Sequence, residues 1–160
     1  MANELGSEST IHERWMREAL ILAEQAAEAD EVPVGAIVVH NGEIIGRGFN
    51  QPIRSCDATA HAEIVAIRSA SQLRSNYRLP GTTVYVTIEP CTMCLGAMIH
   101  ARVDRLVFGA TEPRAGAVVS QGSLIKAGHF NHQLSFIDGV LAEECSSLMQ
   151  SFFRNRRKGN

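Results

Sequence analysis

The chain has 160 residues, of which 45% are hydrophobic and 20% are charged, and its formal net charge is −2. This length suits one domain with a proper core, and the composition excludes disordered and fibrous proteins. The apolar runs fall far short of the ~20 residues of a membrane-spanning helix, and the first residues lack the pattern of a secretory signal. We therefore expect a cytoplasmic protein without membrane contact, whose 4 cysteines are metal-binding or catalytic thiols rather than disulfides.

The charges are unevenly distributed along the chain. Residues 1–31 carry eight acidic and two basic residues, a balance of −6, whereas residues 151–160 carry four basic residues and no acidic one, a balance of +4. Association with a phosphate backbone depends on where positive charges lie rather than on their sum. The basic residues Arg154, Arg156 and Arg157 therefore have two interpretations: contact with a nucleic acid, or a solvated helix end that complements the helix dipole.

The first half of the chain predicts a helix, a hairpin and a second helix. We expect a flexible tail over residues 1–9 and a single domain over residues 10–160. Thr10 to Glu13 has the pattern of a capping box at a helix start, and apolar residues follow at helical spacing. The β-branched segment 32–40, the Asn41-Gly42 turn and the segment 43–50 predict an antiparallel hairpin. A polar loop over residues 51–59 then leads to a helix over residues 60–74.

The second half alternates strands and helices. We expect strands over residues 83–88, 105–108 and 133–137, a helix over residues 91–101, a loop over residues 109–122 and a final helix over residues 141–157. This alternation predicts an α/β fold, a three-layer α/β/α sandwich around one mixed, five-stranded sheet. The helix over 91–101 is apolar on most sides and is expected to be buried on more than one face. Either the first and last helices cover it, or a second copy of the chain does, which would make a homodimer.

Two short segments carry residues suited to metal chemistry, His61-Ala-Glu63 and Pro90-Cys91-Thr-Met-Cys94. Cys91 and Cys94 are three residues apart at a helix start, so both thiols can face one point, and the helix dipole favours the thiolates that a metal requires. With His61 they form a set of one nitrogen and two sulfur ligands that suits Zn²⁺. Three protein ligands leave a fourth position for water, which is typical of catalytic zinc. We therefore predict one zinc ion per chain.

Glu63 is the candidate general base. Residues two apart on a helix do not share a face, so Glu63 is not expected to bind the metal beside His61. Zinc with two thiolates and a neutral imidazole is formally uncharged and acidifies its water less than an all-histidine site, so a nearby base is needed. Three alternatives stand beside this hypothesis: a surface role for Glu63 favoured by the helix dipole, a closed structural site with Cys56 as fourth ligand, and redox chemistry at the Cys-x-x-Cys pair.

The order of these segments matches a known signature. His-Ala-Glu followed about thirty residues later by Pro-Cys-x-x-Cys is the pattern H-x-E…P-C-x-x-C of zinc-dependent nucleobase deaminases. From about Trp15 to Arg157 the chain resembles the bacterial tRNA-specific adenosine deaminases (the TadA family), which are cytidine/deoxycytidylate deaminase-like. The matching segments include Glu31-Val-Pro-Val-Gly35, Thr59-Ala-His-Ala-Glu63, Tyr85-Val-Thr-Ile-Glu-Pro-Cys91 and Phe152-Phe-Arg154.

This resemblance implies a cytidine-deaminase-like fold, and it implies hydrolytic deamination of adenosine to inosine at the wobble position of a tRNA anticodon by a cytoplasmic homodimer. It implies that His61, Cys91 and Cys94 bind zinc and that Glu63 is the proton shuttle. It also implies that Asn50 hydrogen-bonds the flipped base, since an asparagine can form two hydrogen bonds to an adenine edge. The alternative for Asn50 is a turn residue ahead of a proline.

The tRNA anticodon stem-loop is the partner that this resemblance implies. Arg154, Arg156 and Arg157 are then candidate tRNA contacts, and the loop over residues 110–122 is a second segment expected to face RNA. Two other functions remain open on the sequence: deamination of a free base or nucleotide such as guanine or cytosine, and a non-catalytic module stabilised by zinc.

Overall fold

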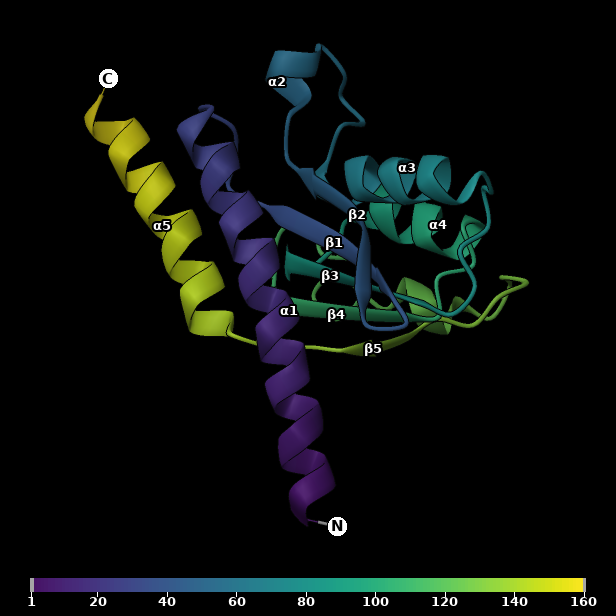
Figure 1. The fold of residues 1–160 in the computed structure, drawn as a ribbon. Coiled ribbons are helices and arrows are strands. Elements are labelled where there is room, and N and C mark those ends of the chain that lie inside the picture. Colours follow the sequence, from purple (N-terminus) through teal and green to yellow (C-terminus); the bar gives the residue numbers. More distant parts are fainter. Residues whose placement is uncertain (1, 160) are drawn as a thin grey trace.

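The computed structural model describes residues 2–159, with side chains from residue 8 onward. The helices and strands are, in chain order, α1 (Ala2–Glu28), β1 (Gly35–His40), β2 (Glu43–Phe49), α2 (Pro52–Ser55), α3 (Ala62–Arg74), β3 (Thr82–Ile88), α4 (Thr92–His100), β4 (Arg105–Ala110), the 3₁₀ helix η1 (Leu124–Ala127), β5 (Ser135–Ile137) and α5 (Ala142–Lys158) (Figure 1). The predicted helices and strands are thus confirmed in type and order. The short helices α2 and η1 are additions that the sequence pattern did not reveal.

Within residues 2–159, five strands form one mixed sheet in the order β2-β1-β3-β4-β5. β1 pairs antiparallel with both β2 and β3, whereas β3, β4 and β5 run parallel. Asn41 and Gly42 join β1 to β2 with φ angles of 49° and 74°, the left-handed conformations that a type I′ turn requires. The predicted mixed, five-stranded sheet and its hairpin are confirmed.

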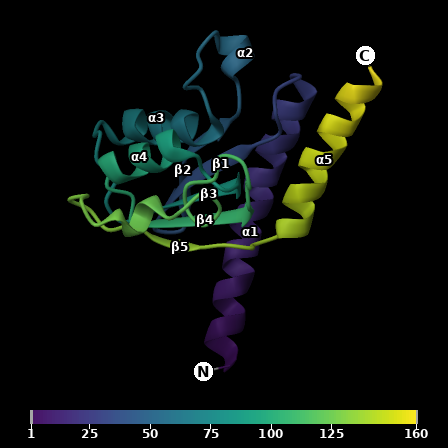
Figure 2. The ribbon, with the colours of Figure 1, turned by 180° about the vertical axis from the view of Figure 1, so that it is seen from behind.

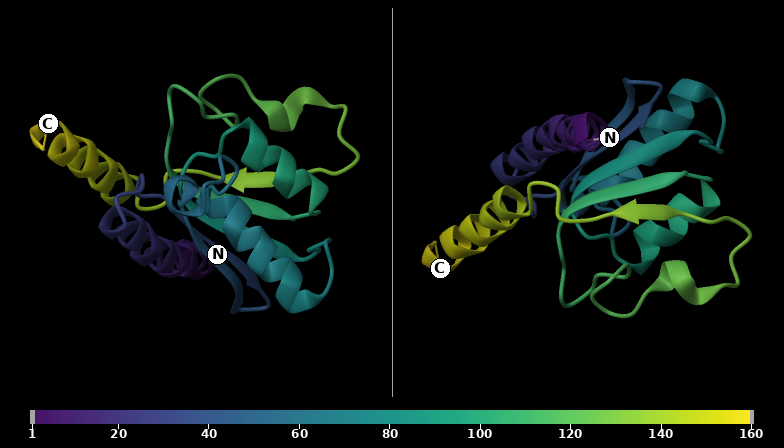
Figure 3. Two further views of the ribbon diagram at one scale, coloured as in Figure 1. Left: turned by 90° about the horizontal axis from the view of Figure 1, so that it is seen from above. Right: turned by 90° about the horizontal axis from the view of Figure 1, so that it is seen from below.

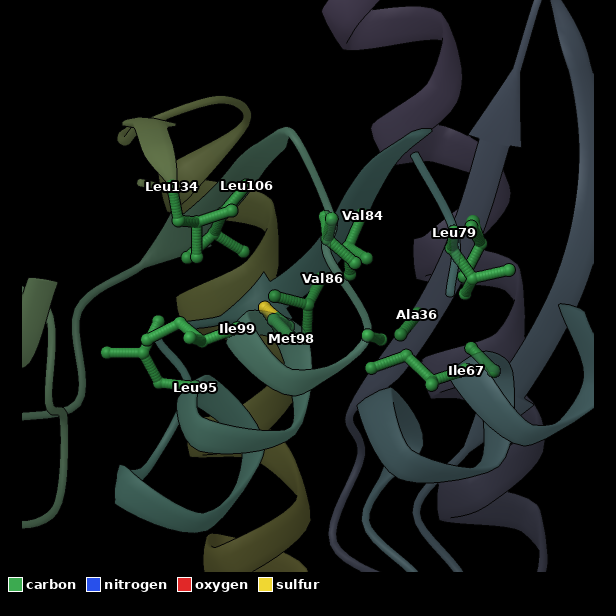
Figure 4. Packing of buried hydrophobic residues seen from close by; sticks show 14 of the residues in the cluster. Ala36, Ile67, Leu79, Val84, Val86, Leu95, Met98, Ile99, Leu106 and Leu134 are labelled. Atoms are coloured by element: carbon green, nitrogen blue, oxygen red, sulfur yellow. The ribbon is translucent and has the colours of Figure 1, made fainter. Parts of the chain in front are cut away.

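Helices cover both faces of this sheet. One apolar cluster joins α3 and α4 to side chains that include Val84, Val86 and Leu106 (Figure 4). A second cluster joins α1 and α5 to the opposite face of the sheet (Figure 3). Tyr85 belongs to this second cluster, because successive strand residues alternate between faces. The three-layer sandwich is therefore confirmed.

α4 packs against the sheet and α3, and not against the first and last helices. Its buried side chains Cys94, Leu95, Met98 and Ile99 belong to the cluster of the sheet and α3, whereas α1 and α5 pack on the other face. The prediction that the first and last helices cover it is therefore wrong. Met93 on the outer side of α4 remains 37% exposed.

α1 begins at Ala2 instead of at the predicted capping box. Thr10 lies inside the helix, so the capping-box prediction is wrong, and residues 2–9, predicted as a loose tail, are helical. This segment contains no proline that would end the helix. The first turns of α1 project beyond the sheet (Figures 1 and 2). Among residues 2–159, no helix is both long enough and apolar enough to cross a bilayer.

Glycines on β2 allow the strand to lie very close to α3. A Cβ added to Gly48 would lie 2.4 Å from the carbonyl oxygen of Ala62, and one added to Gly46 would lie 2.3 Å from that of Ala66. Only a residue without a side chain permits this approach of two backbones. The contact fixes the first turn of α3 against the end of β2, which places the two segments that follow and precede them, Asn50 and His61, at the same edge of the sheet.

Candidate active site

The helices α3 and α4 both begin at one point beside the sheet. His61 is the N-terminal capping residue of α3 and Cys91 that of α4, each with an extended backbone. Cys94 and Glu63 lie in the first turns of these helices. The positive ends of both helix dipoles therefore point at the same small region, which favours thiolates and other anionic groups there.

His61, Cys91 and Cys94 form a compact cluster of potential metal ligands. The Nδ1 atom of His61 lies 3.7 Å from the sulfur of Cys91 and 3.5 Å from that of Cys94, and the three ligand atoms all lie within 4.8 Å of one another. A tetrahedral Zn²⁺ with ordinary Zn–S and Zn–N bonds separates a sulfur from a nitrogen ligand by about 3.6 Å. The three side chains therefore fit a zinc ion without rearrangement.

The two thiols have different proton affinities. Hydrogen bonds from the Cys94 side chain and, against the effect of burial, from His61 and the Cys94 backbone lower the pKa of Cys91 to about 4. The pKa of Cys94 is raised, first by its hydrogen bond to Cys91 and then by burial. Cys91 is thus a ready thiolate, whereas Cys94 needs the charge of a bound cation to lose its proton.

Glu63 is a buried carboxyl group beside this cluster. Its side chain is only 4% exposed, which rules out the alternative of a surface glutamate. Burial raises the pKa of the Glu63 carboxyl, against the opposing effects of a hydrogen bond from its own backbone N–H, of Cys94 and of His61. A carboxylate with a raised pKa accepts a proton more readily than an exposed one.

A cavity of about 270 Å³ opens beside these residues. It is lined by Val32, Val34, Asn50, His61, Glu63, Ile88, Glu89, Cys91, Glu112, Ala115 and Met149. The structure thus brings Asn50, predicted to bind the base, to the same space as His61, Glu63 and Cys91. The apolar members of the lining come from the segment after α1, from β3, from the loop after β4 and from α5, which are far apart in the sequence.

A wider groove of about 770 Å³ adjoins the cavity. Val32, Glu112 and Met149 line both spaces, and the groove adds Pro113, Arg114, Phe153, Arg156 and Arg157. Two of the three predicted tRNA-contacting arginines, Arg156 and Arg157, therefore lie at this groove together with Arg114. Arg154 is exposed on the same helix but is not among the residues that line it.

Cys56 lies apart from the metal ligands. It is exposed, follows α2 and directs its thiol to the carbonyl oxygen of Ile53 at 3.8 Å. Among the described side chains, the cluster able to hold a metal contains His61, Cys91 and Cys94 alone. The alternative of a site closed by Cys56 is therefore wrong, and the open fourth position is retained.

Two buried glutamates, Glu31 and Glu89, are revealed by the structure and not by the sequence pattern. Glu31 is 1% exposed and accepts hydrogen bonds from the backbone N–H groups of Ile53 and Arg54, at 3.1 and 2.9 Å, where α2 begins. Glu89 receives hydrogen bonds from the loop that follows β4. Both lie in segments that match the family, 31–35 and 85–91, but the sequence could not reveal their partners, because the groups that they bind lie more than twenty residues away.

Comparison with known proteins agrees with this geometry. Residues 9–110 match the cytidine and deoxycytidylate deaminase zinc-binding region. The chain is 48% identical over 151 residues to the tRNA-specific adenosine deaminase of Haemophilus influenzae, covering 94% of this chain and 87% of that relative.

Two solved structures show the same fold. One, from a study of A-to-I editing by tRNA:A34 deaminases at the wobble position of transfer RNA, has a TM-score of 0.82 at 41% identity and covers 84% of this chain and 98% of that one. The guanine deaminase of Bacillus subtilis has a TM-score of 0.60 at 39% identity and covers 62% and 64% of the two chains. With such identity over nearly its whole length, the chain belongs to the tRNA-specific adenosine deaminases of the cytidine and deoxycytidylate deaminase zinc-binding family, and His61, Cys91 and Cys94 are its zinc ligands.

Proposed function

We propose that this protein deaminates adenosine to inosine at the wobble position of a tRNA anticodon. The observation that carries the proposal is that a small cavity at the zinc ligands shares Val32, Glu112 and Met149 with a larger groove, which is lined by three arginines. The cavity suits one base, and the groove supplies positive charge for the phosphates on either side of it. A free base carries no phosphates, so an enzyme for a free base does not need the arginines of the groove.

The cavity wall suits a base that has left its stack. Its apolar side chains, among them Val34, Ile88 and Met149, offer apolar surface to the faces of a ring, while Asn50 supplies polar atoms for its edge. Bases of a single-stranded loop are already partly unstacked, so the cost of extrusion is small. An anticodon loop therefore fits this site better than a duplex.

The residues of the cavity divide the reaction between them. His61, Cys91 and Cys94 would hold the zinc ion, which would supply Lewis-acid activation of a water molecule. Glu63 accepts the proton of that water, protonates N1 of the adenine ring as C6 is attacked, and then helps to deliver a proton to the departing ammonia. Asn50 holds the base edge so that C6 faces the attacking oxygen. Water is consumed, and inosine and ammonia are released.

The direct test uses a tRNA that carries adenosine at the first anticodon position. Incubation with the zinc-loaded protein is expected to convert this adenosine to inosine, which sequencing reads as G, and to leave adenosines in the stem unchanged. Free guanine, free cytosine and free adenosine serve as parallel substrates. Conversion of a free base with no edited tRNA would instead favour the free-base deaminase function.

Replacing Arg156 and Arg157 together by glutamine is expected to weaken tRNA binding and to reduce its salt dependence. If each contacts a phosphate, the slope of log K against log salt concentration shrinks by roughly 0.7–0.9 per lost contact. The charge-matched control is the double replacement of Arg14 and Arg17, which lie on α1 outside the groove. An unchanged slope in the Arg156/Arg157 variant would assign these residues to the solvated helix end. Replacing Arg154, which does not line the groove, is expected to have a smaller effect.

We also propose that the working unit is a homodimer formed through α4. The outer side of this helix carries the exposed Met93 beside the half-buried Gly96 and Ala97, a small apolar surface with few side chains to order on association. Sedimentation at micromolar concentration is expected to give twice the chain mass of 17.4 kDa, and Met93→Lys is expected to shift the equilibrium towards monomer. A wild-type monomer under these conditions would contradict the proposal.

We place this activity in the cytoplasm. Cys56 is an exposed free thiol, and Cys91 and Cys94 must stay reduced to bind zinc, conditions that a reducing compartment maintains. The proposed tRNA substrate is present there as well.

A further inference from the structure

Glu89 follows β3 and stands two residues before the zinc ligand Cys91. Its carboxylate faces the loop after β4, which lines one side of the cavity. Its side chain is 3% exposed. One carboxylate oxygen accepts hydrogen bonds from the backbone N–H of Glu112, at 3.0 Å, and from the hydroxyl of Ser120. The other accepts three backbone N–H groups, those of Val118, Val119 and Ser120, at 3.0, 2.9 and 3.1 Å. A single carboxylate therefore holds both ends of the segment 112–120.

This segment, which we call the wall loop (residues 112–120), provides one side of both spaces. Glu112 and Ala115 line the cavity, and Glu112, Pro113 and Arg114 line the groove. The backbone N–H of Ala117 also donates to the carbonyl oxygen of Pro90 at 2.9 Å, one residue before a zinc ligand. The wall loop thus forms part of the wall of the cavity that Asn50 also lines.

The wall loop depends on this carboxylate for its backbone hydrogen bonds. Four N–H groups of the loop point at Glu89, and buried N–H groups without an acceptor are costly. Hydrogen bonds to a charged oxygen are shorter and stronger than those between neutral groups. Gly116 packs against the same carboxylate so closely that an added Cβ would lie 2.3–2.5 Å from three of its atoms. The carboxylate is therefore an anion seated in a nest of backbone amides.

We propose that Glu89 is a positioning residue that fixes the wall loop and thereby sets the affinity for the substrate nucleotide. The inference rests on the proposed function, which it deepens. The zinc ligands and Glu63 stand at the starts of α3 and α4 and not in this loop, so we expect them to stay in place when the contacts of Glu89 with the loop are weakened. Contacts from the wall loop form with the bound substrate and persist in the transition state, and the loss of such contacts raises KM more than it lowers kcat.

The variant Glu89→Gln replaces the carboxylate oxygen that accepts hydrogen bonds from Glu112 and Ser120 by an amide NH₂ group. Its amide oxygen can replace the oxygen that binds Val118, Val119 and Ser120. The amide NH₂ then faces the hydroxyl of Ser120, which can turn to accept, and the N–H of Glu112, which cannot. The change therefore releases the loop at Glu112, beside the cavity.

Two further variants complete the set. Gly116→Ala displaces the carboxylate from the opposite side without a change in charge, so it tests the same contact independently. Tyr85→Phe is the control: it removes a buried hydrogen bond of 2.8 Å to His12. Tyr85 belongs to the apolar cluster of α1 and α5, whereas Ala117 and Val118 of the wall loop belong to the cluster on the other face of the sheet. It reports what loss of stability alone does to the kinetics.

The experiment measures zinc content, amide hydrogen exchange and steady-state deamination of an anticodon stem-loop RNA for each full-length variant. We expect one zinc per chain throughout, and faster exchange of the Glu112 amide in Glu89→Gln and Gly116→Ala. We expect KM for the RNA to rise about tenfold in both, with kcat changed by less than about threefold. Tyr85→Phe is expected to keep the wild-type KM, since a smaller folded fraction lowers the apparent kcat without changing KM.

Several outcomes would overturn the inference. A wild-type KM in Glu89→Gln and Gly116→Ala would show that the wall loop does not set substrate affinity, and a fall confined to kcat would place Glu89 in the chemical step. Loss of zinc in these variants would show that Glu89 supports the metal site instead. If the wild-type protein leaves the RNA unedited, the proposed function fails; unchanged exchange of the Glu112 amide in Glu89→Gln would separately show that Glu89 does not hold the loop.

Discussion

Glu63→Gln is expected to lower the rate of deamination by ~10²–10⁴-fold, the range typical of a general acid–base residue, with the zinc content unchanged. We expect the upper end of this range because one carboxylate both deprotonates water and protonates the base. The replacement keeps nearly the same shape in a position that is 4% exposed, so folding is expected to stay close to that of the wild type. The glutamine amide, however, has no site that can take a proton at neutral pH.

Three measurements on this variant separate the roles that Glu63 can have. Zinc content, melting temperature and inosine formation all stay at wild-type values if Glu63 is idle, and zinc is lost with activity if Glu63 binds the metal. Retention of a tenth or more of the wild-type turnover would end the proposed mechanism. Glu43→Gln, an exposed glutamate at the start of β2, is the control for the loss of one carboxylate.

Cys94→Ala is expected to lose the zinc ion and a large part of the stability that depends on it. Cys94 is completely buried, and its sulfur lies 3.5 Å from the Nδ1 atom of His61, so no other side chain can take its place. A ligand present at 1,000 times its dissociation constant stabilises the folded state by about 4 kcal/mol. For a chain of this size, this corresponds to a fall in melting temperature of roughly 8–16 °C. A chelator is expected to bring the wild type to a similar melting temperature.

The other cysteines provide matched controls. Cys145→Ala removes a buried thiol from the cluster of α1 and α5, and Cys56→Ala removes an exposed one. Both are expected to keep one zinc per chain, although the first loses packing in the core. Stoichiometric zinc in Cys94→Ala by elemental analysis would contradict the ligand assignment, and loss of zinc in Cys56→Ala would restore the site with four ligands.

The sequence by itself determined the features that depend on neighbouring residues. The spacing of Cys91 and Cys94 on one helix, the Asn41-Gly42 turn and the alternation of apolar residues are local, and each led to the correct ligand pair, hairpin or strand. His61 was predicted as the third ligand because a histidine completes a zinc site with two cysteines. Its position thirty residues before Cys91 also matches the signature of zinc-dependent deaminases. The capping box at Thr10 misled for the same reason: it is a local pattern, and the helix continues past it to Ala2.

Tertiary structure alone decided what surrounds the metal. The carboxylate of Glu89 binds amides up to 31 residues away, and Met149 reaches the cavity from α5; neither contact leaves a periodic or adjacent pattern in the chain. The same holds for α4, which lies against the sheet and α3 because the crossover between β3 and β4 carries it to that face. Long-range packing selects one partner among many side chains of similar type, and a pattern read over a few residues contains no information about that choice.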